Sequence, residues 1–233
     1  DAIRRDFDAG YDWVALGQED NFARCQCSNC EALDSYRDQT PPGFYETYDQ
    51  HGFEVLAKHI PERLLLLQKA IIDAVGKTHP DKTIQLLVYR QSLLPSKKFA
   101  GFGNNVVGEM CDIDPRALEP WKGKVRAFTA YLYWFDSTIQ SGMGMGHHVT
   151  PRQVAERIRF LRNQNFVGIY QIPGGNWGLQ GPVYYTLSKT MGNPDLDPDE
   201  IVQEYCRGVY GNAAPIMRTF FKVLYQRDIE PLE

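Results

Sequence analysis

Three cysteines within six residues form the most unusual chemical pattern in this sequence. Cys25, Cys27 and Cys30 follow the spacing C-x-C-x2-C. Thiolates are good zinc ligands, so three of them this close together can converge on one tetrahedral ion. A fourth ligand would have to come from another part of the chain: Cys111, His51 or His79. The pattern equally suits one disulfide, or small side chains buried as thiols. It predicts a structural zinc or a disulfide, and no cofactor for catalysis.

Acidic side chains follow several short apolar runs and form a second pattern. Glu19 and Asp20 follow the first run, Glu109 and Asp112 lie at the end of the third, and Asp136 follows the fourth. Glycoside hydrolysis needs two carboxyl groups, one protonated as the acid and one ionised as the base or nucleophile. Helix caps and solvated loops also use such residues, so the alternative is a purely structural role.

Aromatic, amide and guanidinium side chains near the same run ends suit carbohydrate binding. Aromatic rings stack on the apolar faces of sugars while polar neighbours bond to the hydroxyls, and an arginine can hold a carboxylate through two hydrogen bonds. Packing of the rings inside a barrel, or pairing of the arginine with a nearby acid, would be the structural alternative. The predicted substrate-binding residues are Tyr89, Arg90, Trp134, Asn176 and Trp177.

Composition excludes some classes of partner. The 233 residues carry 25 Lys and Arg against 29 Asp and Glu, for a formal net charge of -4, and no basic cluster exceeds the pair Lys97-Lys98. A nucleic-acid-binding surface needs a basic face, and a membrane helix needs about 18 consecutive apolar residues, which the chain lacks. We therefore expect a carbohydrate partner, with no nucleic acid and no membrane.

The elements that must position these residues alternate between short apolar runs and longer amphipathic stretches, which is typical of βα units. The predicted strands are Trp13–Leu16, Thr83–Tyr89, Asn105–Glu109, Phe128–Phe135 and Phe166–Gln171. Helices are predicted over Pro61–Val75, after the cap residues Thr150 and Asp197, and over Ala213–Gln226. No repeat or linker interrupts the pattern, so residues 1–233 are expected to form a single domain.

Five βα units with polar loops after their strands predict an α/β fold of the (β/α)8 TIM-barrel type. A closed barrel needs eight strands, so this chain would hold roughly the last five units and continue upstream of residue 1 in a parent protein. Other domains of that parent chain would then be its partners. The alternative is an open doubly wound sheet, against which stands the lack of a glycine-rich phosphate motif after the first strand.

Several motifs together resemble a bacterial domain family of uncharacterised function. They are Gln18–Asn21 followed by the cysteine trio, Leu86–Tyr89, Tyr131–Trp134, Asn193–Asp197 and Tyr210–Ala214. The resemblance extends from Trp13 to about Leu224. That family is similar to the catalytic barrels of α-glucuronidases and, more distantly, of hexosaminidases.

The resemblance implies a glycosidase-like barrel, seen here from about its fourth strand to its eighth. It places the general acid at Glu19 or Asp20 and the base or nucleophile at Glu109 or Asp136. It also implies a secreted or periplasmic location. We therefore expect a glycoside hydrolase-like protein acting on a polysaccharide or an acidic oligosaccharide. Two alternatives remain open: a non-catalytic carbohydrate-binding barrel, and an α/β module organised by a structural zinc at the cysteine trio.

Overall fold

The computed structural model describes residues 1–18, 25, 27–34, 52–56, 58, 62–96, 99–134, 149–172 and 177–227. The chain divides into two compact units. The first comprises residues 1–131 with 167–169, and the second comprises residues 132–166 with 170–233. Each unit is considered by itself below. None of the described helices is long and apolar enough to cross a membrane.

All five predicted strands are present in one sheet. They are β1 (Trp13–Leu16), β2 (Thr83–Val88), β3 (Val106–Met110), β4 (Ala127–Leu132) and β5 (Phe166–Gln171). The strand order is β1-β2-β3-β4-β5, so each strand lies beside the next one in the sequence. The pairs β1–β2, β2–β3 and β3–β4 are parallel. An α/β fold with a five-stranded parallel sheet is therefore confirmed.

The strand order also decides against one predicted alternative. A doubly wound sheet reverses its strand order at a switch point, and the five described strands show no reversal. Because crossovers between parallel strands are right-handed, stepping always in the same direction places the connecting segments on one face of the sheet. The open doubly wound arrangement is therefore wrong for this part of the chain.

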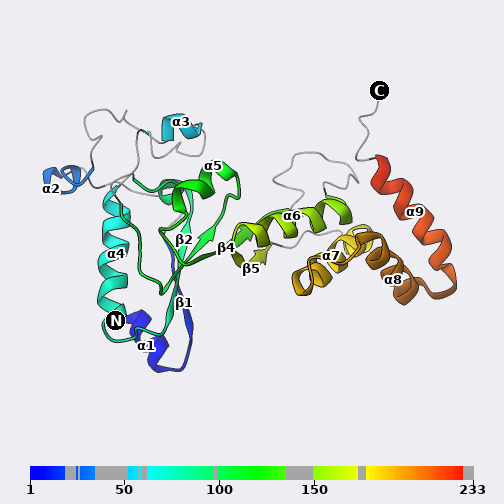
Figure 1. Cartoon of the computed structure of the whole chain (residues 1–233), viewed down its shortest axis with the longest axis horizontal. Helices are drawn as coiled ribbons and strands as arrows, with labels where there is room; N and C mark the ends of the chain where they lie inside the picture. Colours follow the sequence, from blue (N-terminus) through cyan, green and yellow to red (C-terminus); the bar gives the residue numbers. More distant parts are fainter. Residues whose placement is uncertain are drawn as a thin grey trace. The chain divides into compact units, whose positions relative to one another are not determined.

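The described part of the first unit also contains short and long helices. They are α1 (Ala2–Asp8), α2 (Ser28–Glu31), α3 (Phe53–Leu56), α4 (Glu62–Gly76) and α5 (Pro115–Leu118), with 3-10 turns η3 (Arg90–Ser92) and η4 (Glu119–Trp121). Figure 1 shows α4 alongside the strands. One face of β2 and β3 is fully buried through Ile84, Leu86, Val88, Val106 and Met110. Trp121 is also fully buried, and its indole Nε1–H donates to the Leu93 carbonyl over 2.8 Å.

The opposite face of the sheet carries polar side chains. Residues alternate between faces along a strand, and neighbouring parallel strands keep them in register. Glu109 on β3 is paired with Leu87 on β2 and with Thr129 on β4. Gln85, two residues before Leu87, points to this same face. One face is thus an apolar core, while the other combines apolar side chains with Gln85, Glu109 and Thr129.

Four longer helices occur in the described residues of the second unit: α6 (Pro151–Asn163), α7 (Trp177–Gly192), α8 (Pro198–Tyr210) and α9 (Ala214–Arg227), with the 3-10 turn η5 (Gly211–Ala213) before α9. The predicted cap residue Thr150 is confirmed, since its Oγ1 accepts from the Gln153 backbone N–H, and the Gln153 side chain completes a capping box by accepting from the Thr150 N–H. Asp197 caps α8 by accepting from the Asp199 backbone N–H. Both helices therefore begin where their cap residues predict.

Candidate functional site

Glu109 lies in a hydrogen-bonded group on the polar face of the sheet. The Gln85 side-chain amide donates both to Glu109 Oε1 and to Thr129 Oγ1, over 2.9 Å in each case. Glu109 is the penultimate residue of β3, which places it close to the carboxyl end of the sheet. Gly168 on β5 continues this face, since a Cβ there would lie 3.3 Å from Thr129 Cγ2. Three neighbouring strands thus contribute to one polar group centred on a carboxyl, and β5 lies beside it.

The environment of Glu109 favours its protonated form. The side chain is half-buried, and this burial raises the pKa of its carboxyl above the ordinary value. Loss of hydration penalises the charged form of an acid, which is how active sites keep a carboxylic acid protonated near neutral pH. The pKa of Glu109 is therefore shifted in the direction that a proton donor needs.

Two further residues predicted to bind substrate follow β2. Arg90 has a φ of 45°, in the left-handed region that residues with a side chain rarely adopt. Its guanidinium carbon lies 5.1 Å from the centre of the Tyr89 ring. The Tyr89 carbonyl accepts from the Gln18 side chain over 2.6 Å, which ties the end of β1 to the end of β2. A strained residue held in place by such contacts marks this strand end as a candidate binding position.

Trp134, predicted as a stacking wall, belongs to the second unit. Its side chain is buried, and the guanidinium of Arg157 on α6 lies 5.1 Å from the ring centre. A cation at this distance from an indole ring is favourable, particularly where water is excluded. In this structure the ring therefore contacts the protein's own arginine.

Four predicted site residues lie outside the described part of the chain: Glu19, Asp20, Asp136 and Asn176. Trp177 is the first residue of α7, but its side chain is also outside the described part. Of the four predicted catalytic carboxyls, the structure thus positions Glu109.

The three cysteines do converge, as their spacing predicts. The Sγ atoms of Cys25, Cys27 and Cys30 all lie within 4.8 Å of one another, and all three residues are free thiols. Cys25 and Cys27 are exposed, and Cys30 is half-buried. Three thiols at this separation could hold a metal ion.

Hydrogen bonding shifts the pKa values of two thiols in this cluster in opposite directions. Donation from the Cys30 backbone N–H, followed by donation from the thiols of Cys25 and Cys30, lowers the pKa of Cys27 to about 7. The pKa of Cys30 is raised to about 11, chiefly because its thiol donates to Cys27. Cys27 is therefore the thiol of this pair that ionises more readily near neutral pH, and the thiolate is the form that binds metals.

A buried ion pair fixes the chain beside the cluster. Arg63, at the second position of α4, donates from Nε to Asp34 Oδ2 over 2.6 Å, and its backbone N–H donates to Asp34 Oδ1 over 3.0 Å. Its Nη1 donates to the Cys25 carbonyl over 2.5 Å, and its Nη2 lies 3.2 Å from Glu31 Oε1. One guanidinium thus connects both ends of the segment that carries the three thiols.

The sequence did not predict this role for Arg63 and Asp34. The available signal was an arginine beside the apolar stripe of the helix predicted over Pro61–Val75, because a charge there needs a partner. The partner, Asp34, is 29 residues away. Nothing in the local sequence identifies an acid at that separation.

Two of the fourth ligands suggested by the sequence are not part of the cluster. Among the described residues, only the three cysteines form a group that could hold a metal ion there, so Cys111 and His79 are excluded. His79 lies beyond the far end of α4, a helix of 15 residues that spans about 22 Å, and its ring bonds to Thr78 and Asp8. The third suggestion, His51, lies outside the described residues.

Comparison with known proteins gives a family but no described relative. No curated protein matches the chain, and no solved structure matches it. One family model matches residues 1–222, which is nearly the whole chain. The chain therefore belongs to the family described as "Domain of unknown function (DUF4838)".

Proposed function

We propose that this chain forms part of a glycoside hydrolase-like (β/α) barrel, in which Glu109 is a catalytic carboxyl. The observation that carries the proposal is the position of Glu109: half-buried, with a raised pKa, one residue before the carboxyl end of a central parallel strand. Barrel enzymes place their catalytic residues at this end of the strands. The expected substrate is a polysaccharide or an acidic oligosaccharide.

The sheet supports the barrel part of the proposal. In a barrel, consecutive parallel strands are neighbours and all crossover helices lie outside, so the other face of the sheet becomes the interior. The five strands follow this order. Glu109, Gln85 and Thr129 lie on the face opposite the apolar residues Leu86 and Met110. They would then point into the barrel, near the mouth where substrate binds.

The environment of Glu109 supports the role of proton donor to the leaving glycosidic oxygen. A general acid must be protonated at working pH, and burial favours that form of Glu109. This differs from the role of base or nucleophile that the family resemblance implies for the same residue. The second carboxyl would come from Glu19, Asp20 or Asp136, which keeps the predicted set intact.

The test is hydrolysis of a panel of nitrophenyl glycosides and glycuronides by the natural protein that contains this chain. Glu109→Gln should lower the rate by at least about a hundredfold, the usual contribution of a positioned acid or base. Glu119→Gln is the matched control, because it makes the same chemical change at an exposed site in the same unit that pairs with Lys122. Equal rates in the two variants would contradict the role of Glu109.

The non-catalytic alternative predicts a different result in the same material. A carbohydrate-binding barrel would bind oligosaccharides without hydrolysing any member of the panel. Glu109→Gln would then leave the dissociation constant for oligosaccharide close to the wild-type value. Measured hydrolysis that depends on Glu109 excludes this alternative.

The convergence of the three thiols favours a second candidate function, a structural zinc site. The natural protein should then contain one zinc per chain, and chelation should lower its melting temperature. Cys27→Ser should lose the zinc, whereas the control Cys111→Ser, outside the cluster, should keep it. Wild-type protein without zinc and with two fewer free thiols than cysteines would instead indicate a disulfide.

A further inference from the structure

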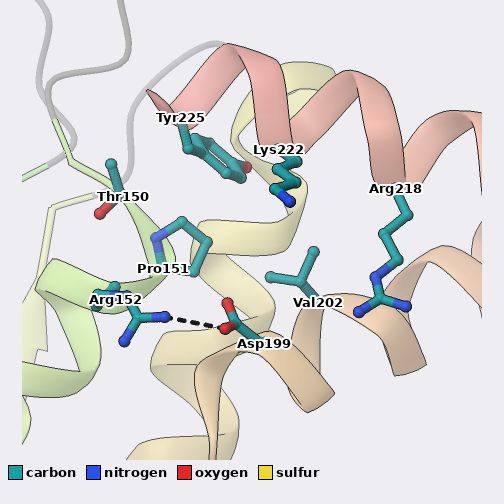
Figure 2. Close-up of a pocket in the computed structure, with 8 residues that line it drawn as sticks. All are labelled: Thr150, Pro151, Arg152, Asp199, Val202, Arg218, Lys222 and Tyr225. Carbon is teal, nitrogen blue, oxygen red and sulfur yellow. Dashed lines mark hydrogen bonds and ion pairs between the residues drawn. The ribbon is translucent and has the colours of Figure 1, made fainter. Parts of the chain in front are cut away.

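The second unit contains a cavity that none of the preceding proposals uses. It lies where the start of α6, the first turns of α8 and the later turns of α9 meet, and its volume is about 380 Å³. Figure 2 shows side chains from these three helices around it. Small-molecule sites typically range from about 300 to 1,000 Å³. The cavity is therefore large enough for a small metabolite.

Positive charge predominates among the lining residues that the structure describes. There, Arg152, Arg218 and Lys222 face one carboxylate, that of Asp199. Arg152 Nη2 lies 2.9 Å from Asp199 Oδ2, so these two charges compensate each other. Within the described part of the chain, neither Arg218 nor Lys222 makes an ion pair. The cavity thus has two cationic groups available for a negatively charged ligand.

The two cationic groups lie on the same side of α9. Arg218 and Lys222 are four residues apart, so they lie one above the other on the helix, where like charges repel. Figure 2 shows both side chains extending from α9 toward α8. Such an arrangement is unfavourable by itself, and an anion bound between the side chains would relieve it.

The N-terminal ends of two helices add to the positive potential in the cavity. Pro151 and Asp199 lie in the first turns of α6 and α8, which have 13 residues each. The N-terminal end of a helix carries partial positive charge, which favours anions nearby. These ends would strengthen anion binding that the side chains of Arg218 and Lys222 provide.

The remaining lining residues favour a ligand with more groups than a bare ion has. Pro151 and Val202 provide apolar surface, and Figure 2 shows the Asp199 carboxylate joined to Arg152 through one of its two oxygens. A carboxylate oxygen accepts hydrogen bonds from hydroxyl groups. A ligand that uses all of these features has an anionic group, a carbon skeleton and at least one hydroxyl.

We propose that this cavity binds a small organic hydroxy acid. Arg218 and Lys222 hold its anionic group, Asp199 accepts from a hydroxyl, and the carbon skeleton lies against Pro151 and Val202. The proposal is independent of the proposed glycosidase activity, since it uses no residue of the Glu109 group. A carboxylate and a phosphate both carry the negative charge that Arg218 and Lys222 require, so either group fits as the anionic group of the ligand.

Calorimetric titration of the natural protein with four probes tests the ligand class. Gluconate and glucose 6-phosphate carry the two kinds of anion, glucose has no charge, and inorganic phosphate has no carbon skeleton. One or both organic anions should bind, more weakly in high salt because the charges are screened. Glucose and inorganic phosphate should bind at least tenfold more weakly. Equal binding of inorganic phosphate and the organic anions, or no binding by either organic anion, would overturn the proposal.

Variants locate the site. Arg218→Gln and Lys222→Gln should each weaken binding of the preferred anion at least tenfold, and Lys222→Arg should restore most of it. Arg207→Gln is the control, because Arg207 is exposed on α8, outside the cavity lining, and the charge change is the same. All the substituted side chains are exposed, so the fold should be retained, which circular dichroism can verify. If Arg207→Gln weakens binding as much as Lys222→Gln does, net charge explains the effect and the site is refuted.

Discussion

The ion pair between Arg63 and Asp34 offers a direct test of how α4 holds the cysteine segment. The exposed fraction of the side chain is 9% for Arg63 and 0% for Asp34. Asp34→Asn removes the negative charge and keeps nearly the same shape. The guanidinium then retains the Glu31 carboxylate at 3.2 Å and the Cys25 carbonyl at 2.5 Å.

The expected loss follows from burial. Removing one partner of a buried pair costs about 3–5 kcal/mol, whereas an exposed pair contributes less than about 1 kcal/mol. Because Glu31 still compensates part of the charge on Arg63, we expect the lower end, about 3 kcal/mol for Asp34→Asn. That is a large share of the roughly 5–15 kcal/mol that stabilises a typical domain.

A double variant separates stability from the geometry of the thiols. Asp34→Leu combined with Arg63→Met removes both charges of the buried pair and leaves the Glu31 carboxylate, whose side chain is 19% exposed, so its loss of stability should be smaller than that of Asp34→Asn. The Cys25 carbonyl, however, loses its Nη1 donor. If the cluster binds zinc, the double variant should therefore bind it more weakly even though it is folded.

Urea unfolding followed by circular dichroism gives the free energies, and competition with a chromogenic chelator gives the zinc affinity. Lys69→Met with Asp73→Leu is the control pair, since this ion pair on α4 is exposed. A loss below 1 kcal/mol for Asp34→Asn would refute the stabilising role of the buried pair. A double variant with the same free energy of unfolding as Asp34→Asn would refute it as well.

Three further substitutions test local features. Because burial raises the pKa of Glu109, the folded chain binds more protons than the unfolded chain above about pH 4.5, so its stability falls as pH rises. Glu109→Gln should remove this fall, and urea midpoints measured from pH 4 to 8 that run parallel to wild type would contradict it. Gly181→Ala should cost about 1–3 kcal/mol, since its Cβ would overlap the Tyr205 hydroxyl, and Tyr205→Phe should recover part of the loss; an unchanged melting temperature would be inconsistent with that contact. Thr150→Val should cost about 1 kcal/mol in thermal unfolding by removing the cap bond to Gln153, and no loss would mean that the bond contributes little.

The strands were predictable from their local composition, even though β1 and β5 contain no buried residue. Trp13–Leu16 and Phe166–Gln171 match the predicted bounds, and β2, β3 and β4 differ from prediction only at their ends. Short runs of apolar and β-branched residues between polar loops carry this information locally. The cysteine cluster was predictable for the same reason, since its three members lie within six residues.

Helix α7 was not predicted, and its composition explains why. Gly178, Gly181 and Pro182 fall in its first turns, and residues of this kind usually interrupt helices. Its buried side includes Thr186 and Thr190, whose hydroxyls donate to backbone carbonyls one turn earlier. These bonds satisfy the polar groups inside the helix, so a buried surface forms without the apolar periodicity that sequence analysis detects.

The Glu109 group depends on strand register, which links the fold to the proposed function. Side chains alternate between the two faces of a strand, so a shift of β3 by one residue would move Glu109 to the face occupied by Leu86 and Met110. The carboxyl would then need to be buried among apolar residues, at high cost. The observed register avoids that cost and brings Glu109 and Thr129 within reach of the Gln85 amide, which donates to both. Apolar burial on one face therefore selects the register, and the register determines which carboxyl is available for chemistry on the other.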